Sequence, residues 1–322
     1  YDALNSPFVR ASSLGRKYGR IAWTQFLRRS PINLRPFIGV PKEHNPKALG
    51  LFLGGFTKLQ AINNVDYSQE IERLMNLLEI NKSKSYSGYC WGYNFDWQSR
   101  AFFIPKFTPT IVNSSFVGHA LLDLYKLTGQ QRALDMAVSI KDFILEDLNR
   151  TKDGDTFCFS YTPVDKTGVH NANLLGASLL IRHFDMVGDE VLRTTALESL
   201  AYSMKYQHSD GSWFYAETSM QSWIDSYHTG FNLQAIRTFL DLGEAQSYRQ
   251  TYQKGVEFYA KNFFLDDGTP KYYHDRVYPI DIHSPAEAIY FFSREGEQYL
   301  ELTDRVAKWT IDNMLSARGD FY

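Results

Sequence analysis

The two turns that repeat along this chain are Val187-Gly188-Asp189 and Asp210-Gly211-Ser212-Trp213-Phe214-Tyr215. The first kind, a Gly followed by a polar residue, also occurs at Gly129, Gly243 and Gly296, and the steps along the series are 59, 55 and 53 residues. Each of these glycines lies between two apolar helical stretches, and Gly suits the left-handed residue that ends a helix. This kind of turn predicts pairs of consecutive helices.

The second kind of turn is Asp-Gly, which recurs at Asp153, Asp210 and Asp267 with a spacing of 57 residues each time. Asp-Gly is typical of tight turns. Each copy is followed by a cluster of aromatic residues, which predicts a short extended or hairpin segment. Two alternating turns at one period predict a repeat built of helical hairpins.

Two classes of helix are expected to alternate. Helices of the first class are apolar on most faces and rich in small residues, which predicts that they are buried. Helices of the second class carry charge on one face, as at Arg193 and Glu198, and are expected outside. The inner helices are expected over 47–62, 113–127, 171–187, 228–242 and 284–293. The outer helices are expected over 12–29, 66–80, 130–149, 189–207, 244–263 and 297–316.

This arrangement resembles the (α/α)6 toroid of the six-hairpin glycosidase superfamily, in which inner helices ring an axis and outer helices surround them. The repeat style is also similar to the helical domain of glucuronyl C5-epimerases. The resemblance implies an all-α fold in which residues 1–322 form a single toroid domain. A closed ring needs a sixth inner helix, and residues 317–322 imitate the loop that precedes one. We therefore expect a trimmed chain whose ring is incomplete at the C-terminus.

Overall charge and hydropathy restrict the partners of the chain. Its 34 Lys and Arg against 36 Asp and Glu give a net charge of −2, which argues against nonspecific nucleic-acid binding and against a polybasic membrane anchor. The longest apolar run, 48–56, is too short for membrane insertion. No signal-like segment is seen, so a cytoplasmic location is expected, with periplasm or secretion left open. The oligomeric state is also left open.

Polar residues at matching repeat positions are the first candidates for chemistry. Asn113, His170, His228 and His283 are 57, 58 and 55 residues apart, each in the first turn of an expected inner helix. In a toroid these turns open on one face, around the axis. An imidazole there can accept a proton or orient a sugar hydroxyl. The alternative is that these residues only cap helices.

Carboxylates occupy matching positions as well. Asp225 precedes His228 by three residues and Asp281 precedes His283 by two, while Asp96 lies among aromatic residues in an earlier loop. The resemblance implies that a hydrolase would use two carboxyl groups as acid and base, separated by roughly 6.5–9.5 Å for inversion. Helix capping is the alternative, since Asp is among the best N-cap residues.

A third grouping suits proton abstraction beside the carboxylate of a uronate, as in lyases and uronate epimerases. Arg276 or Arg100 could bind such a carboxylate through paired hydrogen bonds. Bases, acids and amide donors would come from Tyr161, His170, Asn171, Tyr227 and His228.

Loop aromatics form the expected sugar-stacking platform, because their flat faces suit sugar rings and their polar tips can bond hydroxyls. Core packing is the alternative for each of them. The candidates are Trp91, Tyr93, Trp97, Trp213, Tyr215 and Trp223.

Metal and cofactor sites are not expected. Three histidines can bind zinc, but His-x-x-x-His and Cys-x-x-Cys spacings are absent from the sequence. Cys90 beside Trp91-Gly92 is similar to the cysteine motif of lanthionine cyclases, but Cys158 has no adjacent His. One disulfide between these cysteines stays open. An Asp-rich run of the terpenoid-cyclase type, a phosphate loop and a G-x-S-x-G elbow are also absent.

The sequence thus predicts an enzyme that acts on an oligo- or polysaccharide by acid–base chemistry. Uronate elimination or epimerisation is preferred over inverting hydrolysis because His, Tyr, Asn and Arg are abundant in the loops. A noncatalytic glycan-binding or scaffold toroid is the remaining alternative.

Overall fold

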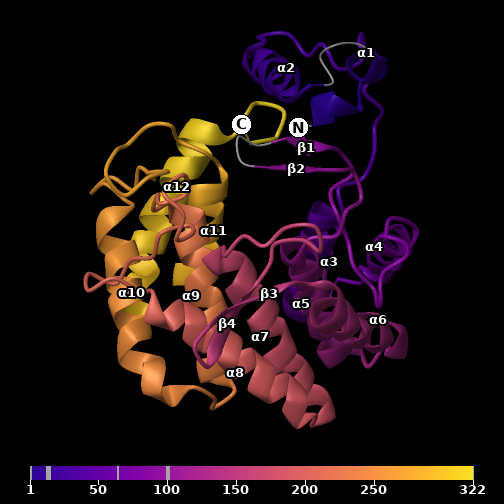
Figure 1. Cartoon of the computed structure of the whole chain (residues 1–322). Coiled ribbons are helices and arrows are strands. Elements are labelled where there is room, and N and C mark those ends of the chain that lie inside the picture. The colour runs from indigo at the N-terminus through magenta and orange to yellow at the C-terminus, as the bar shows by residue number, and fades with distance from the viewer. Residues whose placement is uncertain (1, 12–15, 64, 99–101, 322) are drawn as a thin grey trace. The chain divides into compact units, whose positions relative to one another are not determined.

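The computed structural model describes residues 2–11, 16–63, 65–98 and 102–321. The chain divides into two compact units, Tyr1–Asn149 with Tyr161–Asp165, and Arg150–Ser160 with Lys166–Tyr322 (Figure 1). The expectation that residues 1–322 form one domain stays a prediction. Within the described ranges, no helix is both long enough and apolar enough to cross a membrane.

The first unit consists of helices and one short hairpin. Helix α3 packs against α4 and α5, and α5 packs against α6. The strands β1 and β2 are antiparallel, with Trp97 opposite Ile104. The bounds are a 3-10 turn at Asp2–Asn5, α1 Pro7–Ala11, α2 Lys17–Arg29, α3 Pro46–Asn63, α4 Ser68–Ile80, β1 Trp97–Gln98, β2 Phe103–Ile104, α5 Ile111–Thr128, and α6 Gln131–Asp142, which continues as a π-helix over Phe143–Asp147.

The second unit repeats the helical hairpin. Helix α7 packs against α8 and α9, α9 against α10 and α11, and α11 against α12. The antiparallel strands β3 and β4 pair Arg150 with Phe159. The bounds are β3 Arg150–Asp153, β4 Thr156–Phe159, α7 His170–Val187, α8 Glu190–Lys205, α9 Ser226–Asp241, a 3-10 turn at Gln246–Tyr248, α10 Arg249–Asn262, α11 His283–Phe292, a 3-10 turn at Glu297–Tyr299, and α12 Leu300–Met314.

The distinction between inner and outer helices is confirmed for most of the repeat. In α7, 13 of 18 residues are buried, and in α5, 11 of 18, whereas α6 buries 4 of 12. Helix α3 differs from the prediction that it is buried all round. It buries Leu49, Gly50 and Leu53 but exposes Phe52 and Ile62, because α4 and α5 cover only one of its sides.

Most of the turns form as their chemistry predicts. Gly129, Gly188 and Gly243 follow the ends of helices with φ values of 70°, 72° and 80°, the left-handed region that Gly adopts without steric cost. Gly296 differs from the prediction, because α11 already ends at Phe292 and Gly296, with φ 116° and ψ 169°, precedes the next 3-10 turn instead. The Asp-Gly turn at 153–154 joins β3 to β4. The other two Asp-Gly turns lead into extended segments that make isolated bridges rather than strands.

Candidate active site

The first turn of α9 holds a carboxylate and an imidazole together. Asp225 has an extended backbone and is the N-cap of α9, where Oδ1 accepts the His228 backbone N–H at 3.1 Å. Asp225 Oδ2 accepts His228 Nδ1–H at 2.7 Å and the indole N–H of Trp223 at 2.8 Å. The Asp225 side chain is fully buried, while that of His228 is 19% exposed. Asp225 therefore caps the helix and also orients the imidazole, so that Nε2 is the nitrogen able to exchange a proton with a ligand.

Helix α11 repeats this arrangement at its own first turn. Asp281 Oδ1 accepts the His283 backbone N–H at 3.0 Å and His283 Nδ1–H at 2.7 Å. The side chain of His283 is 63% exposed, so this pair lies nearer to solvent than the pair on α9. Because α9 and α11 pack against each other, two Asp-oriented imidazoles are carried by adjacent helix ends.

Tyr227 lies between the two imidazoles. Its ring centroid is 4.2 Å from that of His228 and 5.5 Å from that of His283. Its hydroxyl is 3.1 Å from the hydroxyl of Tyr272. Burial, followed by the negative charge of Asp225, raises the pKa of Tyr227 above its ordinary value, and the same causes raise the pKa of Tyr272. Both phenols are therefore protonated at neutral pH and can donate hydrogen bonds.

An aromatic wall borders the α9 pair. Tyr215 stacks on Trp223 with ring centroids 4.7 Å apart and an interplanar angle of 11°. Tyr215 is also 4.6 Å from the His228 ring, and both aromatic residues are half-buried. Tyr215 and Trp223 were both expected in the sugar-stacking platform, and Tyr215 is the one of the two whose ring contacts His228.

A third His–carboxylate pair lies at the first turn of α7, and its acid, Glu217, was not predicted from the sequence. His170 is fully buried, with Nε2 3.0 Å from Glu217 Oε1 and Nδ1 3.1 Å from Ser203 Oγ. Since a carboxylate only accepts, Nε2–H donates to Glu217. Both ring nitrogens of His170 are thus engaged within the chain, and the catalytic role expected for His170 stays a prediction.

Glu217 follows a residue that pairs with the start of α7. Val169 and Ala216 form an antiparallel bridge, and the His170 N–H donates to the Tyr215 carbonyl at 3.2 Å. The side chain of Glu217 is 32% exposed. Glu217 lies 47 residues from His170 in the sequence, so no local spacing indicates it.

Several residues proposed as ligand contacts pack the core instead. Trp91 and Trp213 are buried, and their indole N–H groups donate to the carbonyls of Leu78 and Ser203 at 2.8 and 2.9 Å. This corrects the expectation that their rings face a ligand. Their wide apolar faces are covered by neighbouring helices, and their only polar atom is satisfied by backbone.

The two candidate asparagines are buried, with polar atoms left unsatisfied. Asn113 is fully buried, and neither its amide nitrogen nor its oxygen has a hydrogen-bond partner among the residues that the structure describes. Asn171 is 2% exposed, and within the same residues its Oδ1 lacks a partner.

Two arginines were proposed to bind the carboxylate of a uronate, and the structure describes one of them. Arg276 is exposed, with its guanidinium 4.4 Å from the Tyr273 ring centroid and its Nε 3.8 Å from Asp275. Arg100 lies outside the described residues.

The remaining candidates belong to the first unit and form an aromatic cluster there. The Trp97 ring is 5.5 Å from Tyr93 and 5.6 Å from Tyr161, and Tyr161 is buried. Asp96 Oδ1 accepts the backbone N–H of Lys106 at 2.8 Å, which joins the residue before β1 to the segment after β2. Asp96 thus has a structural partner.

The described residues were expected to hold no metal site, and the two cysteines could have formed a disulfide. Over 2–11, 16–63, 65–98 and 102–321, no three His, Cys, Asp or Glu side chains are grouped so that they could hold a metal ion. Cys90 and Cys158 are both buried free thiols, so the disulfide left open by the sequence does not form. Burial, assisted by the charge of Asp147, raises the pKa of Cys90 to about 12.

Comparison with known proteins identifies the fold. No protein-family model and no curated relative matches the sequence. A cellobiose 2-epimerase from Bacillus thermoamylovorans is 16% identical, with a TM-score of 0.69 over 88% of this chain and 81% of that one. An α-mannanase of glycoside hydrolase family 76 from Bacteroides thetaiotaomicron is 11% identical, with a TM-score of 0.66 over 86% and 77%. A D-mannose isomerase is 14% identical, with a TM-score of 0.63 over 88% and 79%.

These likenesses confirm the expected fold, an all-α (α/α)6 toroid of helical hairpins.

Proposed function

We propose that this chain is a carbohydrate-active enzyme that moves protons with the Asp225–His228 and Asp281–His283 pairs. The observation that carries the proposal is the pair of imidazoles at adjacent helix ends, each held through Nδ1–H by a carboxylate 2.7 Å away. An imidazole oriented in this way exchanges protons at Nε2, and His is the most frequent general acid and base in enzymes.

The reaction class that two such groups suit best is proton transfer at a carbon next to a sugar carbonyl. One neutral imidazole accepts the proton from carbon, the electron pair moves onto the carbonyl oxygen, and the other imidazole, protonated at Nε2, returns a proton. The hydroxyl of Tyr227 can donate a hydrogen bond to the oxyanion, because its raised pKa keeps it protonated. The similarity in fold to a cellobiose 2-epimerase and a D-mannose isomerase supports this class.

Hydrolysis is the weaker candidate for this site. An inverting hydrolase needs one carboxyl group that reaches the glycosidic oxygen and another that reaches water. Both oxygens of Asp225 already accept N–H groups of this chain, and the side chain is fully buried. Asp225 is therefore better suited to positioning His228 than to contacting substrate.

The loops around the two pairs favour an uncharged sugar over a uronate. Segments 208–225 and 266–281 together carry seven Asp and Glu against two Lys and Arg. One of the two cations, Lys271, donates to the His274 carbonyl at 2.7 Å, and burial lowers its pKa. The other, Arg276, lies beside Asp275. A uronate carboxylate would therefore meet more repulsion than attraction here.

The test is incubation in deuterium oxide with neutral aldoses, neutral oligosaccharides and uronate polymers. We expect deuterium at the carbon next to the carbonyl of a neutral sugar, detected by NMR. We also expect His228→Gln and His283→Gln each to lower the exchange rate by about 10²–10⁴-fold. The exposed residue His44 provides the matched control, and His44→Gln should leave the rate unchanged.

Other outcomes would assign another function. New reducing ends without deuterium uptake would identify a hydrolase, and an unsaturated uronate product would identify a lyase. Glycan binding without any turnover would leave the noncatalytic toroid. Normal exchange in both histidine variants would refute the assigned roles.

A further inference from the structure

Charge is distributed very unevenly along this chain. Residues 1–42 carry eight Lys and Arg against a single Asp, whereas residues 43–322 carry 26 against 35. The net charge of −2 is therefore the sum of a first segment at +7 and a remainder at −9. A near-zero total charge is therefore compatible with a basic surface on the first segment.

Helix α2 lies in this basic segment, and one of its sides is packed. Thr24 and Leu27 are buried. The Arg20 guanidinium lies 4.0 Å from the centroid of the Phe103 ring, and its Nε donates to Gln98 at 2.9 Å. These contacts hold α2 in a definite orientation, so its opposite side is presented outward.

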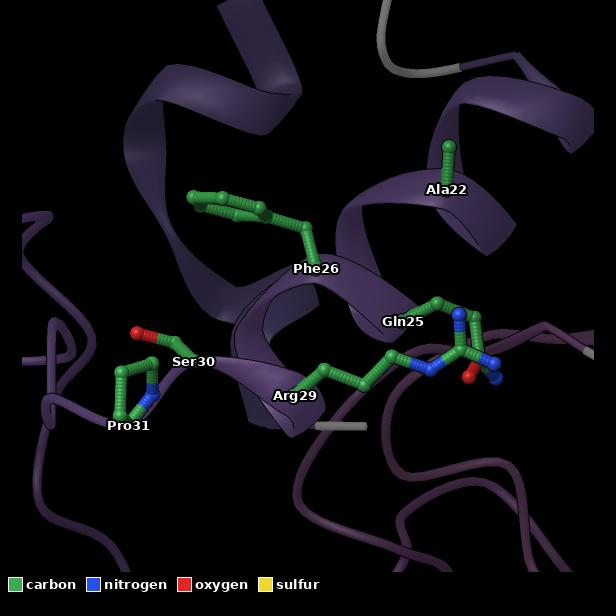
Figure 2. A pocket seen from close by; sticks show the side chains of 6 residues that line it. All are labelled: Ala22, Gln25, Phe26, Arg29, Ser30 and Pro31. Carbon is green, nitrogen blue, oxygen red and sulfur yellow. The ribbon is translucent and has the colours of Figure 1, made fainter.

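The outward side of α2 carries an apolar stripe. Tyr18, Ala22 and Phe26 follow one another at four-residue intervals and form one stripe along the helix. Tyr18 is 80% exposed and Phe26 55%. Figure 2 shows Phe26 and Arg29 on this helix, beside an open hollow of about 470 Å³ that Ala22 and Pro31 also line.

Exposed apolar side chains continue beyond the end of α2, and two exposed cations lie in its last turn. Ile32 and Phe37 are 64% and 79% exposed. Arg28 and Arg29, both exposed, have no acidic partner in the part of the chain that the structure describes. We call Tyr18, Phe26, Arg28, Arg29 and Ile32 the α2 surface.

We propose that the α2 surface binds an anionic phospholipid membrane as an interfacial element that lies on the bilayer. Apolar side chains of an amphipathic helix bury into the boundary between headgroups and acyl chains, while neighbouring cations meet the lipid phosphates. The exposed aromatics favour a membrane over a polyanion dissolved in water. A dissolved polyanion would neutralise Arg28 and Arg29 but would leave Tyr18 and Phe26 in water.

The test is cosedimentation of the full chain with vesicles of phosphatidylcholine, with and without phosphatidylglycerol. We expect binding only to the anionic vesicles, and weaker binding at higher salt. Each cation near the surface contributes a factor of roughly five. The variant Arg28→Glu/Arg29→Glu should therefore bind at least about 25-fold more weakly. The variant Tyr18→Ser/Phe26→Ser should also lose binding, although its charge is unchanged.

Matched controls lie on exposed sites of the second unit. Arg249→Glu/Lys254→Glu on α10 makes the same change in charge, and Leu300→Ser/Ile311→Ser on α12 removes two exposed apolar side chains. Both should sediment like the unmodified chain, and circular dichroism should show equal helix content in all variants.

The proposal is overturned by any of four results. The first two are absence of vesicle binding and equal binding to neutral and anionic vesicles. The third is that the control variants on α10 and α12 lose vesicle binding as much as the α2 variants do. The fourth is that the chain binds polyaspartate through Arg28 and Arg29 but does not bind vesicles. The sugar assay is separate, so failure here leaves the proposed activity untouched.

Discussion

Replacing Asp225 with Asn tests whether this residue only caps α9 or also orients and charges the His228 imidazole for proton transfer. The carboxylate accepts three N–H groups, the backbone N–H and Nδ1–H of His228 and the indole N–H of Trp223, at 3.1, 2.7 and 2.8 Å. An amide of the same size offers one accepting oxygen and one NH2 group that only donates. In either orientation of the amide, at least one of the three N–H groups faces another donor.

The cheaper orientation keeps the amide oxygen toward the imidazole and the indole. It removes the cap bond to the His228 N–H, which costs about 1 kcal/mol. It also converts two hydrogen bonds to a charged acceptor into bonds to a neutral one, which costs about 1 kcal/mol more in total. The free energy of unfolding should therefore fall by about 2 kcal/mol.

The effect on rate should be much larger than the effect on stability. When His228 accepts a proton, the carboxylate 2.7 Å from Nδ1 stabilises the resulting positive charge. Without that charge, the deuterium-exchange rate should fall by about 10²–10⁴-fold, the size of a general-base contribution. Urea unfolding measures the first quantity, and NMR in deuterium oxide measures the second.

Asp189 provides the matched control, because it is the N-cap of α8 and accepts the Val191 N–H at 2.9 Å without any imidazole. Asp189→Asn should cost up to about 1 kcal/mol of stability and leave the exchange rate unchanged. If Asp225→Asn behaves in the same way, Asp225 only caps α9, and the role assigned to the Asp225–His228 pair is wrong.

Three further predictions test other parts of the structure. Glu217→Gln removes a half-exposed charge beside the aromatic wall and should raise KM for the sugar about tenfold with little change in kcat, measured by steady-state kinetics. On α3, Gly50→Ala would bring the new Cβ within 2.9 Å of the Val117 side chain and should lower the free energy of unfolding by about 1–3 kcal/mol. Gly55→Ala on the same helix meets open space and should raise the free energy of unfolding by up to about 1 kcal/mol. Urea unfolding measures both. The Cys90 thiol, with its pKa raised to about 12, should resist thiol reagents at neutral pH until the chain is unfolded; labelling of the native chain would contradict its burial.

The helices were predictable because their limits depend on local chemistry. The inner helix expected over 171–187 is observed as His170–Val187, and the outer helix expected over 189–207 as Glu190–Lys205. A capping glycine and a capping aspartate act on residues within one turn. Burial was less predictable. Helix α3 has the composition of an inner helix, but its exposure depends on neighbours distant in sequence.

The candidate site also has parts that the sequence indicates and parts that it does not. The Asp225–His228 and Asp281–His283 pairs follow from spacings of three and two residues across a helix start, which the sequence displays directly. The contact between His170 and Glu217 joins residues 47 positions apart, so no local pattern reveals it.

By itself, the sequence determined the hairpin repeat, the helix limits and the two Asp–His pairs, because each depends on interactions within a few residues. It also contained the concentration of cations in residues 1–42. Only the tertiary structure decided which side chains are covered. Trp91 and Trp213 lie in the core while Phe26 faces solvent, although all three are large aromatic residues. The reason is that burial depends on which distant helix packs against a residue, and that partner is chosen when the whole chain folds.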